Sequence, residues 1–215
     1  MINLIIKEFK LAIHPTMLMF LLLSSMVLIP SYPFTIIFFY SCLGIFFYII
    51  NTRETKDIYY SMILPIDKKD IVKGKIISII VTQIIQILLM MFFIIIKNKI
   101  NPYSNNVGID ANIILLSIGF FIFSIFNYTF LTKYFKNINK IGLPFTISTI
   151  FISIIIFISE TSTHFVPFVK NILDTTDNVY INIKIIFFII SIIFYIILNI
   201  ITFNKSVKNF INFDL

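Results

Sequence analysis

The chain has 215 residues, of which 59% are hydrophobic and 13% charged, and its net charge is +7. Soluble domains contain about 45–50% apolar and about 25% charged residues. This composition excludes an ordinary water-soluble domain and predicts an integral membrane protein. In such a protein the excess of basic residues sets the orientation of the chain in the membrane and suits contact with anionic lipid, so it does not require a nucleic acid partner.

Residues 1–15 predict an amphipathic helix that lies along the inner membrane surface. Two kinds of residue recur at spacings of three and four, which places them on different faces of one helix. The apolar face comprises Ile2, Ile5, Ile6, Phe9 and Ile13, and the polar face comprises Asn3, Lys7, Lys10 and His14. The alternative interpretation is an ordinary basic flank of the first membrane span.

Six segments are apolar enough to cross a bilayer, because a spanning helix needs about 20 such residues and pairs its own backbone groups. Residues 11–52 contain no charge, but Pro30 and Pro33 interrupt the run, which favours two helices joined by a tight turn. The predicted spans are residues 16–30, 33–50, 76–96, 111–132, 141–159 and 183–204. Together they form a single all-α transmembrane domain over residues 1–215.

The lysine and arginine residues predict that both termini are cytoplasmic. With the N-terminus inside, thirteen of the 17 basic residues lie on the cytoplasmic side and four lie outside. Short loops with an excess of these residues stay in the cytoplasm. The four external residues are Lys97, Lys99, Lys170 and Lys184.

The connection at residues 51–75 predicts a short cytoplasmic helix between spans two and three. Arg53 to Met62 can form this helix, and Pro65 should stop it. Asp67 can cap a second helix that continues into span three. The connection also holds six cations and four acids among aromatic and apolar residues, a mixture that solvent alone does not require.

Apolar residues ringed by charge in this connection are typical of a docking surface for a partner protein. The alternative is an aromatic belt in the lipid interface. The candidate docking residues are Glu54, Asp57, Tyr59, Tyr60, Leu64, Pro65, Asp67 and Lys68.

Residues 160–180 predict a second segment that is not a simple span. A short apolar stripe precedes Asp174 and favours a helix that packs against the external end or dips towards the membrane. The stripe consists of Phe165, Phe168, Val169, Ile172 and Leu173.

Polar residues inside the predicted spans are neutral and follow helical spacing. Hydrogen bonding between helices is their commoner use, and lining a path for an amphipathic substrate is the alternative. They are Ser78, Thr82, Gln83 and Gln86 in the third span and Thr146, Thr149 and Ser153 in the fifth.

The sequence contains no catalytic constellation that points to an enzyme. His14 and His164 fall on opposite sides of the membrane, and a single cysteine, Cys42, cannot hold a structural zinc ion. The G-x-x-x-x-G-K-[ST] phosphate loop is absent, and apart from Lys184 at the edge of the last span, the spans contain no ionisable groups of the kind that ion-driven carriers use. We expect a non-catalytic chain that binds neither a metal nor a cofactor.

Residues 54–75 resemble the stretch after span two in the small membrane subunits of bacterial type II ATP-binding-cassette exporters. The matching features are an acidic start, a Leu-Pro turn, a basic pair, an Ile-Val pair and a lysine that enters span three. In this sequence they are Glu54, Leu64, Pro65, Lys68, Lys69, Ile71, Val72 and Lys75. The architecture of nearly the whole chain is similar to that family.

The resemblance implies a coupling helix between spans two and three that seats in a cytoplasmic ATPase subunit, which binds ATP and Mg. It also implies a second permease copy or a paralogue, an interfacial N-terminal helix, and residence in the bacterial cell membrane. Within the family, the Phe- and Ile-rich, short-loop form is similar to exporters of small amphipathic or hydrophobic peptides. The alternative function is a stand-alone membrane immunity or scaffold protein that binds a peptide without transport.

Overall fold

The computed structural model describes residues 2–12, 15–101, 103–175 and 177–212, and within these residues every regular element is a helix. The all-α fold class is therefore confirmed. The elements are α1 (Ile2–Lys7), η1 (Glu8–Ala12), α2 (Pro15–Leu22), η2 (Leu23–Leu28), α3 (Ile36–Glu54), α4 (Asp57–Ile63), α5 (Lys68–Ile100), α6 (Ile113–Tyr134), α7 (Gly142–Phe165), η3 (Val169–Leu173) and α8 (Ile181–Ile211).

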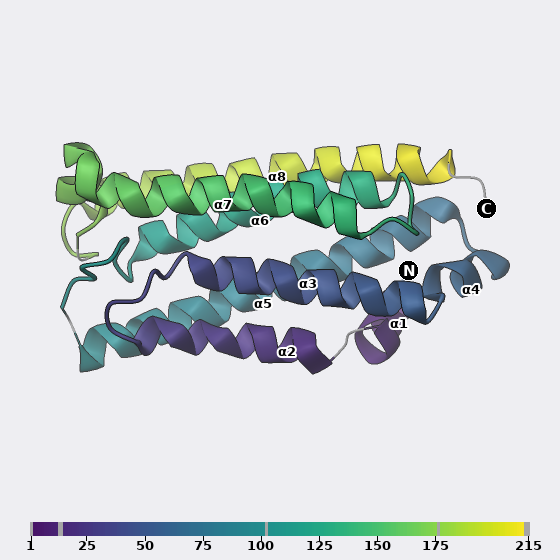
Figure 1. Ribbon diagram of the computed structural model, residues 1–215, viewed down its shortest axis with the longest axis horizontal. Helices are drawn as coiled ribbons and strands as arrows, with labels where there is room; N and C mark the ends of the chain where they lie inside the picture. The colour runs from purple at the N-terminus through teal and green to yellow at the C-terminus, as the bar shows by residue number, and fades with distance from the viewer. Residues whose placement is uncertain (1, 13–14, 102, 176, 213–215) are drawn as a thin grey trace.

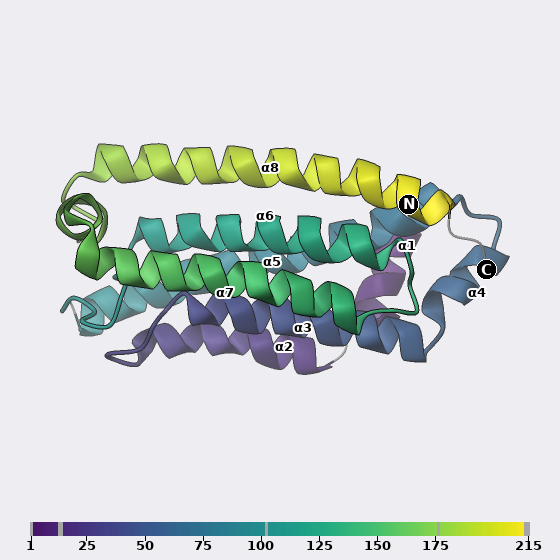
Figure 2. The same cartoon turned by 45° about the horizontal axis from the view of Figure 1, so that its top comes forward.

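The long helices run side by side as one bundle, with α1 and the C-terminal end of α8 at the same end (Figures 1 and 2). Five helices of the described chain are long and apolar enough to span a membrane, namely α3, α5, α6, α7 and α8. Of these, α5 has 33 residues and α8 has 31, so both continue well beyond their predicted spans. Polar residues can continue a helix beyond the membrane. Hydropathy therefore locates the membrane-embedded part of a helix but does not locate where the helix begins and ends.

The first predicted span is shorter than the others, because residues 15–28 form the apolar helix that consists of α2 and η2. Its 8 α-helical and 6 3₁₀-helical residues reach about 24 Å, since a 3₁₀-helix rises more per residue than an α-helix. This reach is less than the hydrocarbon thickness of about 30 Å. The helix lies beside α3, where Phe20 stacks on Phe47 with ring centroids 5.9 Å apart.

Helix α6 lies at the centre of the bundle and packs against α7 and α8. Phe123, Phe126 and Phe130 on this helix are fully buried. Phe38 of α3 meets Phe123 edge to face, with ring centroids 5.6 Å apart. These contacts hold α3 and α6 together in one aromatic core, and this core positions the elements at both ends of the bundle.

The end of the bundle that carries η3 is closed by the Glu160 carboxylate near the end of α7. It accepts hydrogen bonds from the backbone N–H of Thr35 at 3.1 Å and of Ile109 at 3.0 Å, and also from the Thr35 hydroxyl group. Gly108 makes this approach possible, because a Cβ atom there would lie 1.5 Å from Oε2 of Glu160. Glu160 thus joins three segments that are far apart in the sequence.

The segment after α7 forms η3, a short turn that does not span and that lies at the end of the bundle opposite α4 (Figure 2). Leu173 is buried, whereas Phe165 and Phe168 are exposed, so only part of the predicted apolar stripe packs inward. The Asn112 amide holds the end of η3 by donating to the carbonyl groups of Leu173 and Thr175, at 2.8 and 3.0 Å.

We expect the two ends of the bundle to be labelled from opposite sides of the membrane. In a Cys42→Ala background, Tyr103→Cys should react with an impermeant maleimide in intact cells, because residue 103 is exposed in the loop between α5 and α6, which the basic residues predict to be external. Lys136→Cys should react only after permeabilisation, because it follows α6 in a basic loop. Labelling of residue 136 in intact cells would overturn the orientation.

We also expect the ionised carboxylate of Asp174 to lower the free energy of unfolding at neutral pH. Burial raises its pKa to about 6, from an ordinary value of 3.8, and the charges of Asp110 and Glu160 add to the rise. The folded state therefore holds the proton more tightly than the unfolded state, and stability increases as pH falls from about 6 towards 4.

Asp174→Asn keeps an oxygen for the Asp110 N–H, which donates to Asp174 at 2.7 Å. The variant should melt above wild type at pH 8 and equal to it at pH 4, as measured by thermal unfolding in detergent. Asp67→Asn, at an exposed carboxylate of the opposite end, is the control. Equal melting temperatures of Asp174→Asn and wild type at pH 8 would contradict the prediction.

Candidate functional site

A buried lysine lies at the junction of four elements, at the end of the bundle that carries α4. Lys75 is on α5, and its side chain is 0% exposed. Its Nζ atom lies 3.0 Å from Glu8 on η1 and 2.9 Å from Asp57 on α4. A buried ammonium group is tolerated only when it is paired and hydrogen-bonded, so these carboxylates are a condition of its burial.

Lys7 completes an alternating arrangement of two lysines and two carboxylates, which we call the ion cluster (Lys7, Glu8, Asp57 and Lys75). Its Nζ atom lies 2.7 Å from Oδ1 of Asp57, and it donates to the Ser61 hydroxyl group at 2.7 Å. The cluster has no net formal charge, and it ties the junction of α1 and η1 to α4 and to the start of α5.

Helix α3 supplies the remaining contacts of the ion cluster. The Tyr48 hydroxyl group donates to Glu8, and the Tyr48 ring lies 5.4 Å from the Lys75 ammonium group. Burial alone would raise the pKa of Asp57, but the charges of Lys75 and Lys7 outweigh that effect and hold the pKa below its usual value. Asp57 is therefore ionised at neutral pH and available to both lysines.

Helix α4 projects from the same end of the bundle (Figure 1), and its exposed face carries an apolar patch. Tyr60, Ile63 and Leu64 are 64%, 80% and 51% exposed, and we call these three residues the α4 tip. The helix is separated from α3 by Lys56, which adopts a left-handed conformation, and it ends at the extended residue Leu64. The tip is thus a discrete unit with a break in the helix on either side.

The structure divides the docking residues predicted from sequence into two groups. Three of them are engaged within the protein. Asp57 belongs to the ion cluster, Tyr59 donates to Asn139 at 3.0 Å, and Lys68 donates to the Ile211 carbonyl group at 3.3 Å. The other five predicted docking residues are exposed, namely Glu54, Tyr60, Leu64, Pro65 and Asp67.

The polar residues predicted in the third span make contacts between helices and within α5. Gln83 exchanges two hydrogen bonds with Asn127 of α6, each of 2.8 Å. Gln86 donates to Ser24 of η2 at 2.8 Å, and Ser78 and Thr82 bond to the backbone of their own helix.

In the fifth span, Thr146 and Thr149 also bond to their own helix, at the Gly142 and Thr146 carbonyl groups. Ser153 is exposed on α7. These three residues therefore do not join helices within the described chain, in contrast to Gln83 and Gln86.

Sequence reasoning missed Glu8, Asn127 and Asn199 as site residues. Asn199 of α8 accepts from Asn127 at 2.9 Å, which brings a third helix into the network of Gln83. A signal existed in each case, because Glu8 is the one acid of residues 1–15 and both asparagines interrupt apolar runs.

The described residues hold no group of three or more His, Cys, Asp or Glu side chains that could bind a metal ion. His164 is exposed and contacts the Val107 carbonyl group at 3.1 Å. His14 and Ile13 of the predicted interfacial helix lie outside the described residues, as do the side chains of Ile2, Asn3 and Ile5.

A comparison with protein families matches residues 3–211 to the model described as ABC-2 family transporter protein. No curated protein and no solved structure matches the chain. The match covers nearly the whole chain, including the ion cluster and the α4 tip.

We expect Lys75→Gln to destabilise the protein by about 3 kcal/mol, because it leaves two buried carboxylates with one cation. Adding Glu8→Gln should restore part of the loss, since the remaining Lys7–Asp57 pair is neutral. The check is SDS-induced unfolding in mixed micelles, followed by circular dichroism.

Lys136→Gln, at an exposed lysine of the same end, should match wild type in this assay. If Lys75→Gln were as stable as Lys136→Gln, or if Glu8→Gln gave no recovery, the ion cluster would not hold this end together.

Proposed function

This chain belongs to the ABC-2 transporter family and is a permease subunit of an ABC transporter, and from that premise we propose that it exports small amphipathic or hydrophobic peptides. A separate cytoplasmic ATPase docks on the α4 tip and binds the ATP and Mg. The observation that carries the docking is the exposed α4 tip joined to the membrane helices by the ion cluster.

The α4 tip has the composition of a protein interface. Tyr60, Ile63 and Leu64 form a compact apolar patch, and exposed Glu54 and Asp67 lie near its ends in the sequence. Aromatic and apolar anchors within a polar rim supply most of the binding energy of protein interfaces. A soluble ATPase with an apolar cleft is the partner that this patch fits.

The ion cluster gives the tip a connection to the transport domain. A force on α4 acts on Asp57, which contacts Lys75 at the start of the 33-residue helix α5 and Lys7 on α1. Because Lys75 is fully buried, displacing Asp57 from it would leave an uncompensated charge. Movement of α4 is therefore coupled to movement of α5.

The membrane part supports a hydrophobic or amphipathic substrate. The side chains that interact across the middle of the bundle are neutral amides and hydroxyl groups, such as Gln83, Asn127 and Tyr195. The outward faces of α7 and α8 expose many isoleucine and phenylalanine residues, which suits contact with lipid and with a second permease copy or a paralogue. The peptide class rests on the resemblance of this short-loop, Phe- and Ile-rich form to peptide exporters.

We expect Tyr60→Ala combined with Leu64→Ala to release the ATPase subunit. Truncating anchors of this kind commonly costs about 2 kcal/mol or more, which corresponds to a roughly 30-fold loss of affinity. The measurement is co-purification of the ATPase and export of peptide at matched membrane levels. The isolated permease should hydrolyse no ATP in either form.

Leu143→Ala is the matched control, since Leu143 is 68% exposed at the start of α7 but lies outside the α4 tip. It should retain the ATPase and transport. If the double variant retained both at wild-type levels, docking at the α4 tip would be wrong. A chain that protects cells from a peptide without any ATPase would instead be a stand-alone immunity or scaffold protein.

A further inference from the structure

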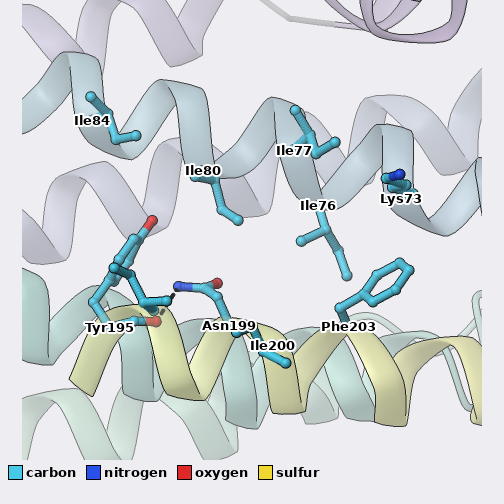
Figure 3. Close-up of a pocket in the computed structure, with 10 residues that line it drawn as sticks. Lys73, Ile76, Ile77, Ile80, Ile84, Tyr195, Asn199, Ile200 and Phe203 are labelled. Atoms are coloured by element: carbon cyan, nitrogen blue, oxygen red, sulfur yellow. Dashed lines mark hydrogen bonds between the residues drawn. The ribbon is translucent and has the colours of Figure 1, made fainter. Parts of the chain in front are cut away.

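A groove of about 400 Å³ runs between α5 and α8 (Figure 3). Its walls are almost entirely aliphatic and aromatic, with Ile76, Ile77, Ile80 and Ile84 from α5 and Ile200 and Phe203 from α8. Lys73 lies at one end, beyond Ile76 and Ile77, and is the one cation among the lining residues. The groove therefore has an apolar body and a basic mouth.

The two polar side chains in the groove wall are already hydrogen-bonded within the protein. The Tyr195 hydroxyl group donates to Gln83 at 2.7 Å, and the Asn199 amide donates to the Tyr195 carbonyl group at 2.9 Å. Asn199 also accepts from Asn127 at 2.9 Å. The body of the groove thus favours hydrocarbon over a polar chain, because a polar group there would lose its contacts with water.

The length of the groove matches one leaflet of a bilayer. Eleven residues separate Lys73 from Ile84 on α5, which corresponds to about 16 Å of helix. Half of the hydrocarbon core is about 15 Å. Lys73 follows the cytoplasmic α4 in the chain and lies two residues before Lys75 of the ion cluster, so the groove covers the inner leaflet.

The mouth keeps a positive charge that the protein does not neutralise. Among the described residues, no ion pair or hydrogen bond involves the Lys73 ammonium group, in contrast to Lys75 with its two carboxylates. Lys69 lies one helical turn earlier and is also exposed. Asp70, three residues before Lys73, offsets one of these two charges and leaves a net positive mouth.

A second groove shows that the basic mouth is not a general property of this surface. It lies between α3 and α7, and it is lined by Phe39, Phe157 and the Glu160 carboxylate. An anionic headgroup would be repelled there. Of these two grooves, the one between α5 and α8 combines a hydrocarbon wall with a cation at its mouth.

We propose that the groove between α5 and α8 binds an anionic phospholipid of the inner leaflet. One acyl chain lies along the isoleucines of α5, and the phosphate group contacts Lys73 and Lys69. The site is separate from the α4 tip and does not depend on the identity of the exported substrate.

The test is native mass spectrometry of the purified full-length chain with equal amounts of phosphatidylglycerol and phosphatidylcholine. A basic residue near an anionic headgroup contributes a factor of about five in binding, so we expect a preference of about fivefold for phosphatidylglycerol. Lys69→Gln with Lys73→Gln should abolish the preference. Lys133→Gln with Lys136→Gln, at exposed lysines near the end of α6, should retain it.

A second variant tests the apolar body of the groove. Ile80→Trp should fill it and reduce retention of both lipids at least about fivefold, while water-soluble glycerophosphate should displace neither lipid from wild type. The same spectra report the monomer and the dimer. If Ile80→Trp lost the dimer but retained both lipids, the groove would be an interface between two permeases and the proposal would be overturned. An equal loss of the preference for phosphatidylglycerol in both double lysine variants would also overturn it.

Discussion

The burial of one lysine at the α4 end of the bundle constrains that half of the protein. Lys75 has no exposed side-chain surface, so its charge must be balanced from nearby, and the balancing groups come from η1 and α4. An unpaired charge in such a position would cost several kcal/mol. The N-terminal elements α1 and η1, the short helix α4 and the start of α5 therefore form one unit, although the chain between Glu8 and Lys75 crosses the bundle twice.

Much of the fold was predictable because a membrane imposes simple rules on sequence. Uncharged apolar runs marked the spans, and Pro65 marked the break that precedes α5. The rest depends on contacts between distant residues. Hydropathy could not show that Glu8 would pair with Lys75, or that α4 would begin at Asp57 and turn Tyr59 inward to Asn139. The first span is short because its helix has only 14 residues and ends at Leu28, before Pro30, and composition does not show that its last turns form a 3₁₀-helix.

The centre of the bundle is held by neutral polar groups, and neutral groups suit this position better than charged ones because no water is available there to solvate a charge. The amides of Gln83, Asn127 and Asn199 satisfy one another across three helices without the desolvation cost of charges. Gln86 is different, because its Oε1 atom is buried and has no hydrogen-bond partner among the described residues. The contact of α5 with η2 is therefore less completely specified than the contacts of α5 with α6 and α8.

The close approach of Gly108 to Glu160 has a consequence for how this sequence can change over time. Any side chain at position 108 would begin 1.5 Å from the Glu160 carboxylate, so it cannot coexist with the present conformation of Glu160. A shorter residue at position 160 would make room but would release the backbone groups of Thr35 and Ile109. A replacement of Gly108 therefore requires the Glu160 carboxylate to swing away, and its hydrogen bonds to the backbone of Thr35 and Ile109 are then lost.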